Sequence, residues 1–217
     1  MADRKMGLLV AGFDYSGANE DEFNDWYDTE HIPERRAVPG FINCERWIGA
    51  ENPKISLATY DLDSFDVLQS EAYRKIAGAN LSPWSKRVTA KCKRICRFEA
   101  EQMPPGNQRA PASAPGLLIV AMNASPEAEK DFNDWYDQEH IPALSNVEGC
   151  LSARRFRIVN SASDGMQRYL AVYHLGSPAV CSSDAWKKAV ETPWTARVRP
   201  HFRDPLRIVL KRYERKA

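Results

Sequence analysis

The sequence has no excess of charge of either sign. Its 217 residues include 30 lysines and arginines against 29 aspartates and glutamates, which gives a formal net charge of +1. Proteins that bind nucleic acid or anionic membranes through their overall charge carry a clear basic surplus. The charge balance therefore predicts neither a nucleic-acid partner nor a membrane partner.

Long hydrophobic runs are also lacking. The apolar run that follows Lys5 is about seven residues long, whereas a membrane-spanning helix needs roughly 20. The residues before this run lack the form of a secretory signal. We expect a cytoplasmic protein.

The sequence contains few cysteines and no cysteine motif. The five cysteines are an odd number, with no CxxC pair and no zinc-type spacing. If Cys92 and Cys96 lie on one strand, they are roughly 13 Å apart, which is beyond the reach of a disulfide. We expect small, buried, apolar side chains in a reducing compartment.

An internal repeat organises the chain. The block from Phe23 to Pro33 recurs from Phe132 to Pro142 with one change, Thr29 to Gln138, at an offset of 109 residues. The ungapped alignment of residues 7–48 with 116–157 has 18 identities in 42 positions, and ten of them lie in this block. A period this long indicates two whole domains rather than a solenoid.

The repeat predicts domain boundaries. Residues 1–101 and 116–217 form two domains of about the modal size. Residues 102–115 contain four prolines and almost nothing to bury, so we interpret them as an extended linker.

Each half shows the same order of predicted elements. An apolar run predicts a first strand at 8–11 and 117–120. A helix follows, which begins near Ser16 or Asn19 in the first half and near Ser125 in the second. We expect this helix to end at Ile32 and Ile141, because each precedes a proline. Further strands are predicted at 41–48, 55–62 and 91–98, and at 150–158, 169–175 and 206–213, with a second helix before the last strand of each half. The order βαββαβ is that of a ferredoxin-like α+β unit.

The repeated block contains the candidate catalytic residues. On a helix, Phe23, Trp26, Tyr27, Glu30 and His31 share one face, and the first two are expected to pack against the sheet. Tyr27 and His31 are four residues apart and can touch, as can Tyr136 and His140 in the second copy.

Two interpretations of the matched histidines stay open. In the functional one, His31 and His140 transfer protons, Tyr27 and Tyr136 donate hydrogen bonds to a developing oxyanion, and Glu30 and Glu139 orient the imidazoles. In the structural one, each histidine is a cation that the helix dipole stabilises and that caps the last turn.

Other matched residues are candidates for substrate binding. Arg46 and Arg155 lie on an otherwise apolar strand face, where each could bind a substrate carboxylate or enolate, or form an ion pair with Glu30 or Glu139. Aromatic pairs could line an apolar cavity or merely fill it. These are Trp26 and Trp135, Tyr60 and Tyr173, and Trp84 and Trp194.

The polar side of the block is repeated as well. Asn24, Asp25 and Asp28 recur in the second copy, which suggests that this face binds backbone groups, an ion or an opposing subunit. One histidine per repeat with scattered acids is a weak metal signal, so we expect no tightly bound metal.

The repeated block and the residues after it resemble the EthD-like members of the dimeric α/β-barrel superfamily. The resemblance is carried by the motif Trp-Tyr-Asp-x-Glu-His-Ile-Pro, a turn at Pro39-Gly40-Phe41 and an arginine on the next strand. The second copy departs at the turn, where it reads Glu148-Gly149-Cys150. The resemblance implies two ferredoxin-like units with facing sheets, here an intramolecular pseudo-dimer, and a cavity in each unit for a small apolar or aromatic ligand. Further homo-oligomerisation stays open.

The superfamily includes cofactor-independent monooxygenases, isomerases, cyclases, haem-degrading enzymes and ligand sensors, so the fold does not decide the activity. We expect an acid/base enzyme without a cofactor, of isomerase, cyclase, lyase or monooxygenase type, that acts on a small cyclic or aromatic catabolite. The alternatives are a non-catalytic binding or sensing module and a haem protein with a histidine as axial ligand.

Overall fold

Each half of the chain forms a four-stranded antiparallel sheet. The computed structural model describes residues 5–104 and 106–215. In the first half the strand order is β4-β1-β3-β2, and in the second it is β8-β5-β7-β6. The strands are β1 (Gly7–Asp14), β2 (Phe41–Gly49), β3 (Ile55–Leu62), β4 (Lys93–Gln102), β5 (Gly116–Ala124), β6 (Cys150–Ser161), β7 (Tyr169–Leu175) and β8 (Phe202–Arg212).

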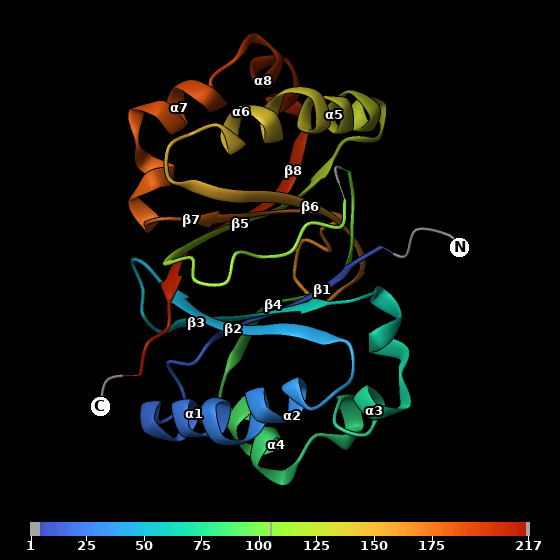
Figure 1. Cartoon of the computed structure of the whole chain (residues 1–217), viewed down its shortest axis with the longest axis vertical. Helices are drawn as coiled ribbons and strands as arrows, with labels where there is room; N and C mark the ends of the chain where they lie inside the picture. Colours follow the sequence, from blue (N-terminus) through green and yellow to red (C-terminus); the bar gives the residue numbers. More distant parts are fainter. Residues whose placement is uncertain (1–4, 105, 216–217) are drawn as a thin grey trace.

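The two sheets join edge to edge into one closed eight-stranded barrel (Figure 1). Strand β2 pairs with β8 from Trp47 opposite Arg212, and β4 pairs with β6 from Phe98 opposite Ser161. The fold prediction is confirmed: two ferredoxin-like βαββαβ units form an intramolecular dimeric α/β barrel.

Alternation along the strands separates the inside of the barrel from the outside. Apolar residues of both halves meet inside the barrel, and among them are Leu57, Phe98, Ile119 and Val172. Ala114 of the connecting segment is fully buried in the same cluster. The expectation that residues 102–115 bury almost nothing therefore needs correction, because this segment contributes to the barrel core.

Helices cover the outer face of each sheet (Figure 1). Two apolar clusters fill the resulting helix–sheet layers, one in each half. The helices are α1 (Glu20–Trp26), α2 (Ile32–Arg36), α3 (Glu71–Arg74), α4 (Pro83–Ala90), α5 (Glu129–Trp135), α6 (Ile141–Ser145), α7 (Asp184–Val190) and α8 (Pro193–Val198). Among the described residues, no helix is long and apolar enough to cross a membrane.

The helix of the repeated block does not end at Ile32 or Ile141, so that prediction was wrong. A π-helical turn, Tyr27–His31, joins α1 to α2, and Tyr136–His140 joins α5 to α6. The Ile32 N–H donates to the Tyr27 carbonyl five residues earlier. A proline in an α-helix would clash with the carbonyl four residues before it. The wider turn relieves this clash, and the helix continues past Pro33.

The turn that follows α2 and α6 explains why both copies contain a glycine there. Gly40 has φ +94° and Gly149 has φ +85°, a region that favours glycine. A β-carbon at Gly40 would lie 2.5 Å from a methyl group of Val67, and one at Gly149 would lie 2.7 Å from Val180.

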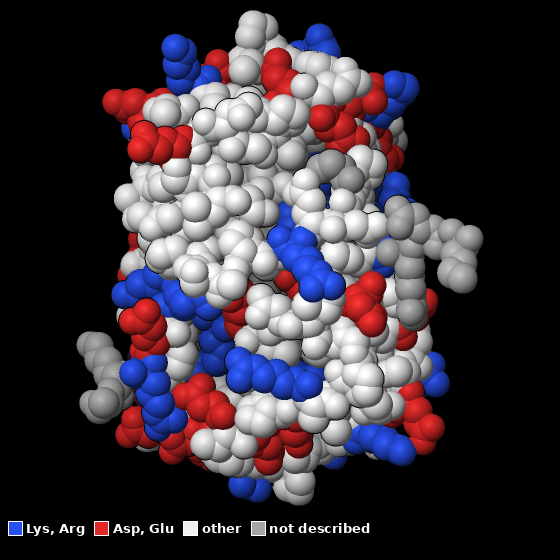
Figure 2. Space-filling model, viewed as in Figure 1, with Lys and Arg blue, Asp and Glu red and all other residues white. Residues whose placement is uncertain are grey.

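Charged side chains of both signs are interspersed on the molecular face that Figure 2 shows, and a broad area near α6 and α7 has few charges. This face offers no single-sign surface of the kind that a polyanion would need.

Candidate functional site

Each half contains a cavity between its sheet and its helices. The first cavity, in the first half, has a volume of about 630 Å³, and the second cavity, in the second half, has a volume of about 320 Å³. Matched residues of the two halves line the two cavities, and six of the pairs are apolar or aromatic residues or histidine. They are Leu9 and Leu118, Ala11 and Val120, Phe13 and Met122, Trp26 and Trp135, His31 and His140, and Tyr60 and Tyr173.

The imidazole of each matched histidine lies beside aromatic rings of its own helix. His31 is 4.6 Å from Trp26 between ring centroids, and His140 is 4.2 Å from Trp135. The tyrosine four residues earlier lies edge-on, 5.4 Å away for Tyr27 and 5.1 Å away for Tyr136. In each histidine, Nδ1 is buried and makes no hydrogen bond to any described residue.

Both matched histidines are neutral at neutral pH. Burial, followed by the charges of Arg35 and Arg46, holds the pKa of His31 well below its usual value. Burial and then Arg155 lower the pKa of His140 to about 3. A cation at the helix end, as in the structural interpretation, does not fit these pKa shifts.

The four matched tyrosines differ in position. Tyr27 lies in the core and does not line the first cavity, whereas Tyr136 lines the second. Burial raises the pKa of each to about 12, against the opposing effect of Arg46 or Arg155. Tyr60 and Tyr173 line the cavities, and their buried hydroxyl groups have no hydrogen-bond partner among the described residues.

Arg46 and Arg155 line neither of the two cavities. Arg46 donates to Asp28 and to Asn24, each at 2.9 Å, and its guanidinium lies 4.3 Å from the centre of the Tyr27 ring. The same contacts recur in the second half, where Arg155 donates to Asp137 at 2.7 Å and Asn133 at 2.8 Å. These contacts explain why Asn24 and Asp28 are repeated, and they replace the expected pairing with Glu30 or Glu139.

Glu30 and Glu139 hold the helices together instead of contacting the histidines through hydrogen bonds. Glu30 accepts from Ser82 at 2.5 Å and from Ser85 at 3.1 Å, and the Trp26 indole N–H donates to Ser85 at 2.9 Å. The second half repeats this network. Glu139 accepts from Thr192 at 2.6 Å, and Trp135 donates to Thr195 at 3.1 Å. The network fixes the position of the cavity tryptophan.

Trp84 and Trp194 lie outside both cavities. Trp84 packs against the core of the first helix–sheet layer. The indole N–H of Trp194 donates to Asp131 at 3.0 Å.

Sequence reasoning missed charged residues on the cavity walls. Arg97 and Arg207 line the first and second cavities, and they are paired with Ala11 and Val120 in the sheets. They are equivalent, but they lie beyond the ungapped alignment, which ends at residues 48 and 157, and their offset is 110 residues rather than 109. Arg35 lines the first cavity and was missed because its counterpart is Leu144.

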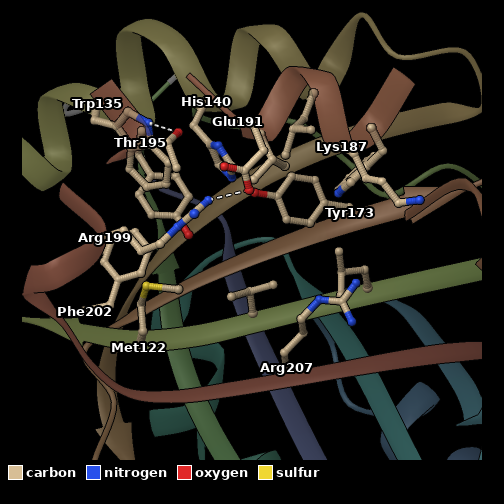
Figure 3. Close-up of a pocket in the computed structure, with 16 residues that line it drawn as sticks. Met122, Trp135, His140, Tyr173, Lys187, Glu191, Thr195, Arg199, Phe202 and Arg207 are labelled. Carbon is tan, nitrogen blue, oxygen red and sulfur yellow. Dashed lines mark hydrogen bonds and ion pairs between the residues drawn. The ribbon is translucent and has the colours of Figure 1, made fainter. Parts of the chain in front are cut away.

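The second cavity is mainly apolar with a charged rim (Figure 3). Met122 and Phe202 lie on its sheet side, opposite His140. At the rim, Arg199 forms an ion pair with Glu191 at 2.6 Å. A cavity with apolar walls and a few polar groups is typical of sites for small ring compounds.

No three histidine, cysteine, aspartate or glutamate side chains converge into a metal site in the part of the chain that the structure describes. The five cysteines are free, and three of them are buried.

Comparison with solved structures supports the assignment of the fold. An anthrone oxidase-like protein matches with a TM-score of 0.67 and 12% identity over 98% of this chain and 93% of that one. A proposed monooxygenase from Fusobacterium nucleatum matches with a TM-score of 0.65 and 10% identity over 98% and 94%. A proposed chlorite dismutase matches with a TM-score of 0.63 and 14% identity over 97% and 96%. The chain therefore has the dimeric α/β-barrel fold.

In this chain both units of the barrel belong to one polypeptide, as a tandem duplication predicts. Residues 116–203 match a family described as a domain of unknown function, DUF4286. No curated protein matches the sequence. These similarities establish the fold, and the activity has to be argued from the cavities.

Proposed function

We propose that the protein is a cofactor-independent acid/base enzyme, of isomerase, cyclase, lyase or monooxygenase type, that acts on a small cyclic or aromatic compound in its helix–sheet cavities. The observation that supports this most is the matched set of tryptophan, histidine and tyrosine in both cavities. A buried polar atom without a partner costs about 1 to 3 kcal/mol. His140 Nδ1 and the Tyr173 hydroxyl are two such atoms.

The chemistry of the second cavity follows from its neutral imidazole. His140 accepts a proton from an acidic carbon of the bound ring compound, and Tyr173 donates a hydrogen bond to the oxyanion that forms. The imidazolium and the anion arise together in an apolar cavity, where their mutual attraction is stronger than in water. This attraction offsets the low basicity of a buried histidine.

Anthrone is the first substrate to test, since one similar structure is named anthrone oxidase-like. Removal of a proton from the carbon between its aromatic rings gives an enolate that can reduce dioxygen. The overall reaction of anthrone and O2 gives anthraquinone and water, so no further oxidant is required. The rate of anthraquinone formation is measured by absorbance with the unmodified protein, His140→Gln, His31→Gln and the double variant.

We expect removal of the active histidine to lower kcat by roughly 10²- to 10⁴-fold without loss of folding. The surface variant His201→Gln is the control. A folded double variant that turns over anthrone at the normal rate would contradict the proposal. If the unmodified protein does not turn over anthrone, mass spectrometry of a copurified ligand supplies the next substrate.

A non-catalytic binding or sensing module is the second candidate. In the described chain no carboxylate accepts a hydrogen bond from either cavity histidine, since Glu30 and Glu139 bind Ser82 and Thr192 instead. A catalytic imidazole is commonly oriented by such a carboxylate, so its absence favours the binding module. Ligand binding that persists in the double histidine variant, with no turnover by any form, would support it. Haem binding would show a Soret band in the purified protein. We also place the protein in the cytoplasm, where its five free cysteines stay reduced.

A further inference from the structure

The two cavities differ at one matched position on the helix that follows the π-helical turn. Arg35 of α2 lines the first cavity, and Leu144 of α6 lines the second. Both side chains are almost wholly buried, with 3% of Arg35 and 1% of Leu144 exposed. The first cavity thus contains a buried cation where the second contains a methyl-bearing side chain.

The guanidinium of Arg35 is only partly satisfied by the protein. Its Nη2 donates to the Ile76 carbonyl at 3.1 Å. Its Nη1 is buried and has no hydrogen-bond partner among the described residues. The nearest carboxylate is that of Glu34, at 3.7 Å and 31% exposed. A buried guanidinium is costly to keep unless an anion binds it through hydrogen bonds.

The surroundings of Arg35 add positive charge. Arg74, Arg94 and Arg97 also line the first cavity, whereas Glu99 is its single acidic lining residue among those described. Arg97 forms an ion pair with Glu99 at 2.5 Å. Arg74 donates to the neutral amide of Gln69 at 3.2 Å. The first cavity therefore has more cationic groups than its own carboxylate can neutralise.

The remaining wall suits a ring. Trp26, Leu68 and Tyr73 supply apolar and aromatic surface, and the buried Tyr60 hydroxyl supplies a hydrogen-bond donor. The first cavity is also about twice as large as the second.

We propose that the first cavity binds a small cyclic or aromatic carboxylate, whose carboxylate group is held by Arg35, and that the second cavity binds an uncharged ring. A guanidinium and a carboxylate match in geometry and charge, and the pair is stronger than neutral hydrogen bonds. This inference rests on the proposed function only in that small ring compounds enter the cavities.

The test compares benzoate with benzamide, which has nearly the same shape but no charge. Binding of each to the intact protein is measured by isothermal titration calorimetry at neutral pH. Phenylacetate and cyclohexanecarboxylate extend the set of carboxylates. We expect saturable binding of at least one carboxylate at one site per chain, with an affinity that depends on Arg35, whereas the affinity for benzamide does not.

Variants then locate the site. Arg35→Leu, which copies the second half, should weaken carboxylate binding by roughly 10- to 100-fold and leave benzamide binding unchanged. Arg35→Gln keeps an amide donor for the Ile76 carbonyl and serves if the leucine variant does not fold. Arg36→Leu is the matched control, because it removes the same charge from the same helix outside the first cavity. Its carboxylate affinity should stay within a factor of two.

Equal carboxylate affinity of the Arg35 variants and the control would overturn the proposal. So would an unmodified protein that binds none of the three carboxylates, or an Arg35→Leu variant that loses as much affinity for benzamide as for benzoate. His31→Gln separates this inference from the proposed function. Normal turnover in this variant and in the double histidine variant, with carboxylate binding that still depends on Arg35, would contradict the proposed function alone. Turnover that depends on the histidines, with unchanged carboxylate affinity in Arg35→Leu, would contradict the carboxylate site alone.

Discussion

Arg154 Nη1 lies 2.9 Å from Asp61 Oδ1, and both side chains are buried. This ion pair joins β6 of the second half to β3 of the first. The other Asp61 oxygen accepts from the Ala110 N–H at 3.2 Å, and Arg154 also donates to the Gln108 carbonyl at 3.3 Å. One buried pair therefore holds the two halves and the segment that connects them.

Loss of one partner of this pair should be more damaging than loss of both. Arg154→Met leaves the Asp61 carboxylate buried without its cation, which typically costs about 3 to 5 kcal/mol in the free energy of unfolding. The double variant Asp61→Leu with Arg154→Met should recover a large part of that loss. Urea unfolding of the four proteins at pH 7 gives the double-mutant cycle, and purely additive effects would contradict a coupled pair.

The charges inside the barrel also select which halves pair. Glu45 is equivalent to Arg154, and Asp61 is equivalent to His174, as the strand registers show. Two copies of the first half in a barrel would therefore place Glu45 against Asp61. Like charges opposite each other disfavour that pairing.

Residues 1–104 and 106–217 produced as separate chains should therefore form a mixed pair. The first half alone exposes an apolar sheet face and should aggregate or associate weakly. Native mass spectrometry of the coexpressed halves measures the species. A mixed pair that is only about twice as abundant as each homodimer, as random pairing gives, would argue against selection by charge, and Glu45→Arg should increase the first-half homodimer.

Stability should fall steeply as the pH drops below 6.5. Burial lowers the pKa of His140 and of His174 to about 3, and the pKa of His31 is lowered as well. The unfolded chain then takes up protons that the folded chain does not. Each histidine contributes its full stabilisation above its pKa in the unfolded chain, about 6.5. As the pH falls from there towards the pKa in the folded chain, the free energy of unfolding decreases by roughly 1.4 kcal/mol per pH unit for each histidine.

Urea unfolding between pH 7 and pH 5 measures this dependence. His174→Asn should reduce the slope by roughly one third, because one of the three buried histidines is removed. His201→Gln leaves those three histidines unchanged and should keep the slope of the unmodified protein. A stability that does not change between pH 7 and pH 5 would show that the histidines are solvated.

The same low pKa predicts an unusual pH dependence of catalysis. Because kcat/KM reports the pKa values of the free enzyme, a base with a pKa of about 3 stays deprotonated throughout the neutral range. We expect kcat/KM for a substrate of the second cavity to be flat from pH 5 to pH 9. A fall of kcat/KM with an apparent pKa near 6.5 would show that the active histidine is exposed.

Much of the fold could be predicted from the repeat. The predicted strands at 55–62 and 169–175 agree with the observed β3 and β7, because each is a short apolar run between turn residues. The course of the helix could not be predicted in the same way. Pro33 indicates a helix end by its local chemistry, and only the i to i−5 hydrogen bond of the π-helical turn shows how the helix continues.

The same turn explains which site residues were misjudged. Positions taken from a regular helix place Glu30 on the face towards the sheet and predict its pairing with Arg46. The extra residue of the π-helical turn changes that register, so Glu30 contacts Ser82, the N-cap residue of α4, and Arg46 contacts Asp28. Arg35 was not predicted as a site residue for a different reason. The comparison of the two repeats identifies residues that both halves share, and Arg35 is matched by Leu144.

The most direct test asks whether the cavity histidines meet a ligand. The imidazole carbon–hydrogen signals of His31 and His140 are assigned in histidine-labelled protein with Gln variants, and benzoate, benzamide and anthrone are added at pH 7. Our account predicts saturable shifts of the His31 signal with benzoate and of the His140 signal with an uncharged ring, while His201 stays unchanged. It would be contradicted if none of these compounds moved either cavity signal, or if all histidine signals moved alike.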